Sequence, residues 1–401
     1  MSRSWLQEIV ATWRAVLGDA GVLLMLIIAP LIYSFFYPWP YSSEQLQRVP
    51  VALVDQDHSA LSRQIQRFVQ ASPRLELRLL TADEGAARAA LAAGEIRGYA
   101  LLPAGLKREA GLGRGQVVPV LADGAYFLPN KIVLQGFAEV LGTVSAGIEL
   151  RQLQAGGQSP LQAQASRSPL NVELAALYNP HEGYGSAVVP AVAVLIIQQL
   201  LLIGVAMWVG QRFECPAPAE RLSLWSARLT ALASLGGLSA AWFYALIFPF
   251  FGYAHGGNPA GSALALGLLV WASCAAGMAL GALLADRERA MALMLATSLP
   301  MAFLAGFSWP REALPVPLWW LGEALPAITG IQALLRLNQM DAPLQAVQPQ
   351  LLALALQALG YSLLAAWAIR HRQRHPAPKE WSICPTTTAA PAPQGPAASR
   401  P

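Results

Sequence analysis

The distribution of charged residues constrains the fold of this chain more than any other feature. Residues 229–285 contain no Asp, Glu, Lys or Arg. Four other long apolar stretches also lack these residues: 21–38, 186–210, 290–310 and 342–369. A helix needs about 20 apolar residues to cross the hydrocarbon core of a bilayer. The pattern therefore predicts a protein that crosses a membrane several times.

The number of crossings follows from where the longest run is interrupted. Residues 252–261 (GYAHGGNPAG) are rich in turn formers, so they divide residues 229–285 into two helices. We therefore expect an α-helical polytopic membrane protein with six transmembrane helices: 19–40, 186–210, 229–251, 262–285, 290–309 and 348–369. Charged residues make up 12% of the chain, about half of the roughly 25% found in soluble domains, which agrees with this class.

Arginine residues near the span ends predict the orientation. One side carries ten of them: Arg3, Arg14, Arg212, Arg221, Arg228, Arg287, Arg289, Arg370, Arg372 and Arg374. The short loops on the other side carry only Arg311 and Arg336. By the positive-inside rule both termini are cytoplasmic and residues 41–185 face outward. The net charge of +4 mostly reflects this bias, so it indicates no nucleic-acid partner.

Residues 41–185 alternate short β-like runs with helical ones. Strands are expected at 49–54, 75–80, 98–102, 117–121 and 171–177, and helices at 59–70, 83–93 and 128–153. Such alternation is typical of an α/β sheet with helices packed on it. The chain should therefore carry an inserted extracytoplasmic α/β domain, with 156–168 as a flexible connection.

Three further segments complete the predicted organisation. Residues 1–18 place Trp5, Ile9, Val10 and Trp13 on one helical face, as in a helix lying in the cytoplasmic membrane interface. Residues 309–340 are broken by prolines and suggest short interfacial or re-entrant helices. Residues 371–401 end in a stretch rich in Pro, Ala and Thr that is typical of a disordered cytoplasmic tail. The first apolar run could also belong to a cleaved signal peptide, but no small-residue cleavage site follows it, which favours an uncleaved anchor.

The lysines exclude one way of driving transport, and the residues of the spans disfavour another. The only lysines are Lys107, Lys131 and Lys379, and none follows a glycine. A Walker A loop, G-x-x-x-x-G-K-[ST], is therefore absent, and the chain has no P-loop ATPase site of its own. The spans lack acids and bases, which disfavours ion-coupled transport and intramembrane catalysis. We predict no catalytic, metal or cofactor site in this chain.

Four polar side chains invite assignment to a site. Asp55 and Asp57 could bind a metal ion, but ending a strand and capping the next helix through Asp57 or Ser59 is the favoured interpretation. Gln198 and Gln199 lie within the second span. They could line a transport pathway, although hydrogen bonds between helices explain such residues equally well.

Several short motifs accompany this layout: VPVALVDQDHSALSR (49–63), GEIRGYALLP (94–103), VLADG (120–124), LYNP (177–180), and Trp-Pro-Arg-Glu and Leu-Pro within 306–317. Together with the predicted topology, they resemble the permease subunits of ABC-2-type transporters, in the group with a large extracytoplasmic domain after the first span. Each motif is weak alone, but their order, spacing and topology match. The similarity extends over nearly the whole chain apart from the tail.

The resemblance implies how the chain is energised. In these permeases the loop after the second span contacts the ATPase and is commonly marked by an Arg-Glu-x-Glu-x-Gly-Thr-like run. The corresponding sequence here, QRFECPAP at 211–218, keeps Arg212 and Glu214 but replaces Gly-Thr. We expect Phe213 to pack into a groove on the ATPase, with Arg212 and Glu214 orienting it. The alternative is that these residues have no role in coupling and simply end a span at the membrane surface.

Two functions remain open at this stage. The first is the permease subunit of an ATP-binding-cassette exporter in the bacterial inner (plasma) membrane. Its partners would be a P-loop ATPase subunit that binds the ATP, a second permease copy or a homologue, a periplasmic adaptor protein and membrane lipids. The alternative is a membrane-anchored protein whose external domain captures a ligand or an envelope partner without transport.

Overall fold

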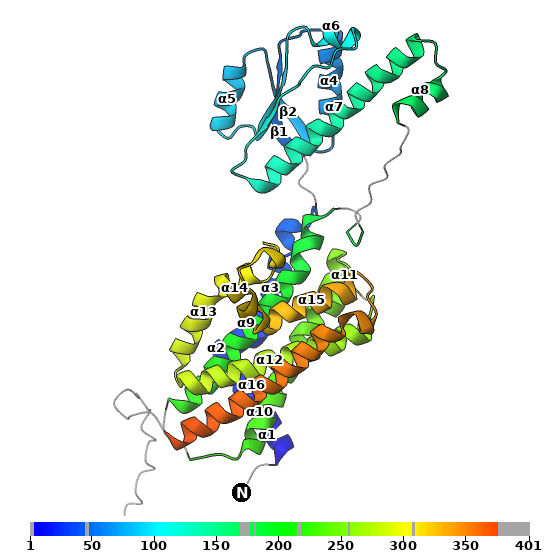
Figure 1. Cartoon of the computed structure of the whole chain (residues 1–401). Coiled ribbons are helices and arrows are strands. Elements are labelled where there is room, and N and C mark those ends of the chain that lie inside the picture. The colour runs from blue at the N-terminus through cyan, green and yellow to red at the C-terminus, as the bar shows by residue number, and fades with distance from the viewer. Residues whose placement is uncertain are drawn as a thin grey trace, which may run out of the picture. The chain divides into compact units, whose positions relative to one another are not determined.

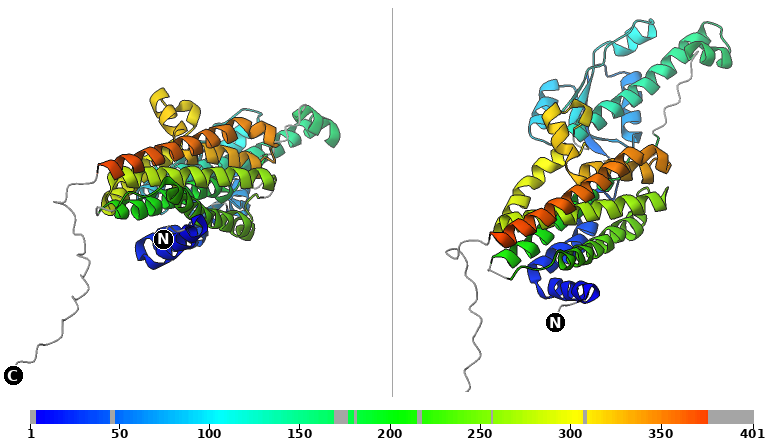
Figure 2. Two further views of the ribbon diagram at one scale, coloured as in Figure 1. Left: turned by 90° about the horizontal axis from the view of Figure 1, so that it is seen from below. Right: turned by 60° about the horizontal axis from the view of Figure 1, so that its bottom comes forward.

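The computed structural model describes residues 4–44, 48–168, 177–179, 182–214, 218–255, 257–306 and 309–375. The chain divides into two compact units. One is an α/β unit at Gln45–Ala175, inside the predicted range 41–185, and the other is a helical unit formed by the remaining residues. Figures 1 and 2 show both units. The expected strand at 171–177 falls almost entirely outside the described residues.

The α/β unit is built on one four-stranded sheet with the order β2-β1-β3-β4. β1 is parallel to β2 and β3, whereas β4 is antiparallel to β3. The bounds are β1 Val49–Asp55, α4 Ala60–Ala71, β2 Leu75–Thr81, α5 Glu84–Ala92, β3 Gly98–Leu102, α6 Leu106–Gly111, β4 Val120–Ala122, α7 Phe127–Ala155 and α8 Pro160–Arg167.

Alternate residues of β1 build the two layers of this unit. Val51 and Leu53 pack with α4 and α7 on one face, while Ala52 and Val54 pack with α5 on the other. This alternation follows from the two-residue repeat of side chains along a strand. Both faces of the central strand are therefore buried, as parallel sheets require.

Two local expectations in this unit need correction. The stretch 156–168 is not a flexible connection throughout, because it contains α8. Ser159 forms a capping box with Gln162, and Pro160 occupies the first turn, both strong helix-start signals. The fourth strand is also shorter than expected and pairs only through Val120–Ala122.

Asp55 holds the turn that follows β1, whereas the Asp57 carboxylate accepts a hydrogen bond from the backbone N–H of Lys107 at 3.2 Å. Asp55 accepts hydrogen bonds from the backbone N–H groups of Asp57 and His58 and from the Ser62 hydroxyl. Ser59 is the N-cap of α4. Across the described ranges, no group of His, Cys, Asp and Glu side chains could hold a metal ion.

The helical unit contains the remaining elements. Their bounds are α1 Trp5–Gly18, α2 Ala20–Leu23, η1 Leu24–Ile28, α3 Ala29–Phe36, η2 Trp39–Tyr41, α9 Tyr184–Phe213, α10 Leu222–Trp242, η3 Phe243–Ile247, α11 Phe248–Phe251, α12 Pro259–Leu284, α13 Arg287–Leu304, η4 Arg311–Ala313, α14 Val316–Glu323, α15 Pro326–Asn338, η5 Leu344–Val347 and α16 Gln348–Arg374. α16 reaches Arg374, so residues 371–374, assigned to the tail, are helical. The tail from residue 376 lies outside the described residues.

Six helices among the described residues are long and apolar enough to cross a membrane: Ala20–Tyr41, Phe127–Ala155, Tyr184–Phe213, Leu222–Phe251, Pro259–Leu284 and Leu344–Arg374. The number equals the predicted one, but the membership differs. α7 belongs to the α/β unit, where Val133 and Phe137 are buried against the sheet. α13, at the predicted fifth span, is not among the six. It has 18 residues and begins with Arg287, Glu288 and Arg289, so its role as a span stays a prediction.

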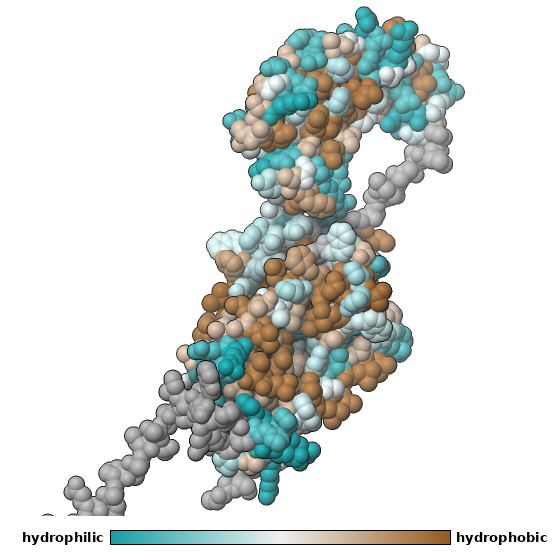
Figure 3. All heavy atoms as spheres, turned by 60° about the vertical axis from the view of Figure 1, so that its left-hand side comes forward, coloured by the Kyte–Doolittle hydropathy of each residue, from teal (hydrophilic) through white to brown (hydrophobic). Residues whose placement is uncertain are grey.

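The surface of the helical unit is strongly apolar. Figure 3 shows a broad hydrophobic area on the face drawn, with hydrophilic residues at one end. Large aliphatic side chains such as Leu356, Leu359 and Leu363 of α16 are more than half exposed. Patches of this extent are rare on soluble monomers. The helices therefore present a surface suited to lipid.

Two π-helical turns, η1 and η3, precede prolines in the same way. Pro30 lies two residues after the end of η1, and Pro249 lies two residues after the end of η3. A proline lacks the N–H that would bond to the carbonyl four residues earlier. For Pro30 that carbonyl belongs to Leu26, and it accepts a hydrogen bond from the Ser239 hydroxyl at 3.1 Å. A neighbouring helix thus satisfies the freed backbone group, as a membrane interior demands.

Candidate functional site

Several charged and aromatic side chains gather where α9, α10 and α13 have their polar ends, around the predicted coupling residues. Phe213, at the end of α9, stacks on Trp225 of α10 with ring centroids 5.5 Å apart and planes within 6°. The Arg212 guanidinium lies 3.3 Å from the centre of the Trp208 ring on the same helix. Both predicted residues therefore have partners within the chain, and each side chain is half-buried.

Glu214 belongs to a second group that joins α9 to α13. Its carboxylate accepts a hydrogen bond from the backbone N–H of Arg287 at 2.9 Å. The Arg287 side chain forms two hydrogen bonds to Asp19, at 2.6 and 2.7 Å, and one to Gln211 at 3.0 Å. Asp19 also caps α2 through Gly21 and Val22. We call Asp19, Gln211, Glu214 and Arg287 the α9–α13 clasp.

The ion pair between Asp19 and Arg287 shifts the pKa of both side chains. The hydrogen bonds from Arg287 hold the pKa of Asp19 below its ordinary value, although partial burial opposes the shift. The same bonds raise the pKa of Arg287. Two parallel N–H···O bonds between a guanidinium and a carboxylate are the strongest form of this interaction. The pair of Asp19 and Arg287 therefore stays ionised throughout the physiological pH range.

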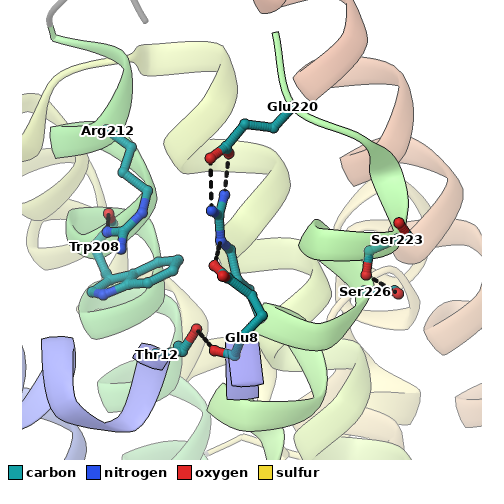
Figure 4. Close-up of polar contacts among 8 residues, drawn as sticks. Glu8, Thr12, Trp208, Arg212, Glu220, Ser223 and Ser226 are labelled. Atoms are coloured by element: carbon teal, nitrogen blue, oxygen red, sulfur yellow. Dashed lines mark hydrogen bonds and ion pairs between the residues drawn. The ribbon is translucent and has the colours of Figure 1, made fainter. Parts of the chain in front are cut away.

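A buried ion pair fixes α1 to α10. Arg228 donates to Glu8 at 2.7 Å and also to both carboxylate oxygens of Glu220. Figure 4 shows Glu8 and Glu220 reaching one guanidinium from opposite sides, with Trp208 and Arg212 nearby. The side chains of Arg228 and Glu8 are only 6% and 5% exposed. We call Glu8, Glu220 and Arg228 the α1–α10 triad.

The α1–α10 triad lies on the face of α1 that packs on the bundle. The sequence predicts that Trp5, Ile9, Val10 and Trp13 share one face of an interfacial helix, whereas the structure buries Ile9 together with Glu8, Thr12 and Val16. Trp5, Val10 and Trp13 are exposed instead, and the indole of Trp13 donates to the Ala231 carbonyl and Ser234 hydroxyl at 3.1 Å. An aromatic side chain with one anchored N–H is suited to the membrane interface. The helix therefore packs on the bundle through both polar and apolar side chains and exposes three large apolar ones.

The loop between α9 and α10 is held at both described ends. Glu214 contacts Arg287 of α13, and Glu220 contacts Arg228 of α10. Residues 215–217 (Cys-Pro-Ala), where the sequence departs from the Gly-Thr part of the family motif, lie outside the described residues. A displacement of this loop would consequently act on α1, α10 and α13 together.

Gln198 and Gln199 both form contacts between helices. Gln198 is fully buried in the middle of α9 and accepts a hydrogen bond from the backbone N–H of Ala327, in the first turn of α15. Gln199 donates to the Met294 carbonyl of α13 at 2.8 Å. These contacts favour the helix-bonding alternative, and a pathway-lining role stays a prediction.

The joint between α14 and α15 is held by residues that the sequence did not single out. Gln357 of α16 donates to the Glu323 carbonyl at 2.6 Å, and the Tyr361 hydroxyl donates to the Ala324 carbonyl at 2.5 Å. Together with Gln198 they satisfy backbone groups of a short helix that is packed against α9, α12 and α16. The described part of 309–340 thus forms short helices as expected, and an interfacial or re-entrant position stays a prediction. The available signal was the presence of polar residues within an otherwise apolar span.

Replacing Asp19 with asparagine tests the clasp without removing the helix cap, since asparagine caps as well as aspartate. We expect a loss of about 1 to 2 kcal/mol in the free energy of unfolding, because the charged hydrogen bonds to Arg287 disappear. The parent should hold this stabilisation above the ordinary Asp pKa of about 3.9 and lose it as the pH falls through the lowered value. Melting curves of both proteins between pH 7 and pH 3 measure this. A parent and variant that differ equally at both pH values would contradict the assignment.

Comparison with known proteins now adds to this geometry. The sequence matches the model of a family described as ABC-2 family transporter protein over residues 20–367. A search of curated proteins found no match. Permeases of this family are membrane transport components without an ATPase site of their own, and they associate with an ATP-binding partner. With its apolar helices, the chain is a multi-pass membrane protein with a transport role, and it belongs to the ABC-2 transporter family.

Proposed function

We propose that the chain is the membrane subunit of an ATP-driven exporter, working with a separate P-loop ATPase that binds the ATP. The observation that supports this most is the loop between α9 and α10, whose two ends are joined to other helices through Glu214 and Glu220. A displacement of this loop would therefore be transmitted to α1, α10 and α13 together. Two copies of the chain, or the chain with a homologue, enclose one transport path above two ATPase subunits.

The proposed mechanism is a rigid-body movement. ATP-driven closure of the ATPases displaces the loop after α9, and the α1–α10 triad and the α9–α13 clasp pass the displacement to the bundle. Phe213 forms the ATPase contact, with its ring supported by Trp225 and with Arg212 and Glu214 flanking it. The Arg-rich helix ends face the cytoplasm of a bacterial inner membrane. The α/β unit then faces outward, where a periplasmic adaptor can reach it.

Co-purification with the ATPase, followed by transport in vesicles, tests this proposal. Phe213→Ala should insert normally but bind the ATPase at least about tenfold more weakly, because aromatic anchors carry much of an interface's energy. ATP hydrolysis should require both proteins. Trp367→Ala is a matched control, since it removes an exposed aromatic ring close to the end of α16.

Two outcomes would count against the proposal. If Phe213→Ala binds the ATPase and transports like the parent, the coupling assignment is wrong. If no ATPase co-purifies and ligand capture by the α/β unit is the only activity found, the chain is a membrane-anchored binding or envelope-assembly protein.

A further inference from the structure

A cavity of about 480 Å³ lies between α10 and α12 within the helical unit. Small residues form its two long walls, Gly237 and Ala241 on α10 and Ala263 and Gly267 on α12. Asn338, at the end of α15, and Tyr244, in η3, complete the lining. Its size falls within the range of about 300 to 1,000 Å³ that is usual for small-molecule sites.

The cavity opens toward the side of the bundle. Ala241, Ala245 and Ala263 are exposed residues on two helices that are apolar enough to cross a membrane. The described residues that line it include no Asp, Glu, Lys or Arg. An occupant therefore enters from the bilayer and is uncharged where it is enclosed.

Two lining residues keep buried polar atoms without a hydrogen-bond partner among the described residues. The amide Nδ2 of Asn338 is one, although its Oδ1 accepts a bond from the Ser262 hydroxyl at 3.0 Å. The hydroxyl of Tyr244 is the other. Asn338 is only 8% exposed. Since buried polar groups are nearly always paired, two such exceptions on one apolar cavity call for an explanation.

The π-helical turn η3 contributes to the same wall. It carries Tyr244 and Ala245, and both line the cavity together with Pro249. The carbonyl of Ala245 lacks its usual donor four residues on, because that residue is Pro249. π-helical turns occur frequently at functional sites. The irregular backbone and the unpaired donors thus meet at one place.

We propose that this cavity binds an acyl chain of an amphipathic lipid-like molecule. The chain occupies the space between the small residues of α10 and α12. The ester or amide carbonyl next to the chain accepts hydrogen bonds from Asn338 and Tyr244, whose donor atoms are covered in the structure and become accessible as the cavity wall yields to the chain. Binding at this site requires no ATPase, so it stands or falls separately from the proposed exporter function.

Photolabelling of the purified full chain tests this site directly. The chain is placed in lipid nanodiscs that contain an ester-linked phosphatidylethanolamine with a diazirine on one acyl chain, and the labelled peptides are identified by mass spectrometry. We expect label on residues 237–267. Gly267→Phe should lower it about tenfold, because the new ring takes the ligand's place. A Cβ at Gly267 meets no atom within 4 Å, so the ring enters open space.

Matched variants separate site occupancy from misfolding. Gly360→Phe is the control, because Gly360 of α16 is equally open but does not line the cavity. Ala241→Phe repeats the test from the opposite wall in case Gly267→Phe does not fold. An ether-linked probe lacks the carbonyl and should label the parent less than the ester-linked probe does, while Asn338→Leu should reduce this difference.

The outcomes are decisive for the site and also identify the source of its ligand. Equal labelling of the parent and both cavity-filling variants would overturn the proposal. If the label falls in these variants and an added single-chain acyl amphiphile competes with it, the ligand exchanges with solution. If the label falls in these variants but is not competed, the ligand is a resident bilayer lipid.

Discussion

Gly281→Leu is expected to push α9 and α12 apart and to leave little folded protein. A Cβ at Gly281 would lie 2.5 Å from the backbone oxygen of Ala206 and 2.8 Å from the Cβ of Val209. Gly277, one turn earlier, faces the Cβ of Val205 at 3.0 Å. Such small residues at four-residue spacing let membrane helices approach closely. Because the obstacle is backbone, overpacking should cost at least about 3 kcal/mol, the upper part of the usual range.

The measurement is the monodisperse fraction on size-exclusion chromatography, together with the melting temperature. Gly360→Leu is the matched control, since the same side chain on α16 meets open space. Gly281→Ala should lie between the parent and Gly281→Leu. A Gly281→Leu protein that melts like the Gly360→Leu control would show that α9 and α12 are not in the contact described.

Arg228→Met is expected to release α1 from the bundle and to lower stability by about 3 to 5 kcal/mol, the usual cost of removing one partner from a buried ion pair. Glu8 would then lie almost fully buried without the charge and hydrogen bond that Arg228 supplies. The double variant Glu8→Leu with Arg228→Met should regain most of the loss, because a buried pair can often be replaced by apolar side chains at little cost.

Arg289→Met is the control for this experiment. Arg289 also pairs with a carboxylate, Asp286, but it is 69% exposed and the closest distance is 3.7 Å. Exposed pairs contribute at most about 1 kcal/mol. Thermal melting, and protease access to α1, compare the variants. Equal melting temperatures for Arg228→Met and Arg289→Met would refute the buried role of the α1–α10 triad.

Local signals explain why much of the fold could be predicted. The strands and helices of the α/β unit follow from side-chain periodicity and caps, such as Ser59 before α4, which act within a few residues. The six expected spans coincide with helices for a similar reason. Length and composition alone do not say what a helix packs against. They therefore fail to separate α7, which lies on the sheet, from a membrane span.

The candidate site was harder to predict from the sequence, because its contacts join residues that are far apart in the chain. Arg212, Phe213 and Glu214 were found through a family motif, but their partners Trp225 and Arg287 were not. The burial of Glu8 against Arg228 was not predicted either, since a carboxylate looks like a surface residue unless its partner is known. The glycine pair at 277 and 281 was readable as a small-xxx-small pattern and could have indicated the contact with α9.

The α1–α10 triad also sets an order of events during synthesis. Glu8 and Arg228 are separated by 220 positions, so at about 5 to 20 residues per second the ribosome needs roughly 10 to 40 s to produce the partner of Glu8. Throughout that interval α1 has to stay at the membrane surface with its carboxylate in water. The exposed Trp5, Val10 and Trp13 are suited to hold it there. The exposed apolar residues of α1 therefore serve the nascent chain, and its buried ion pair serves the finished one.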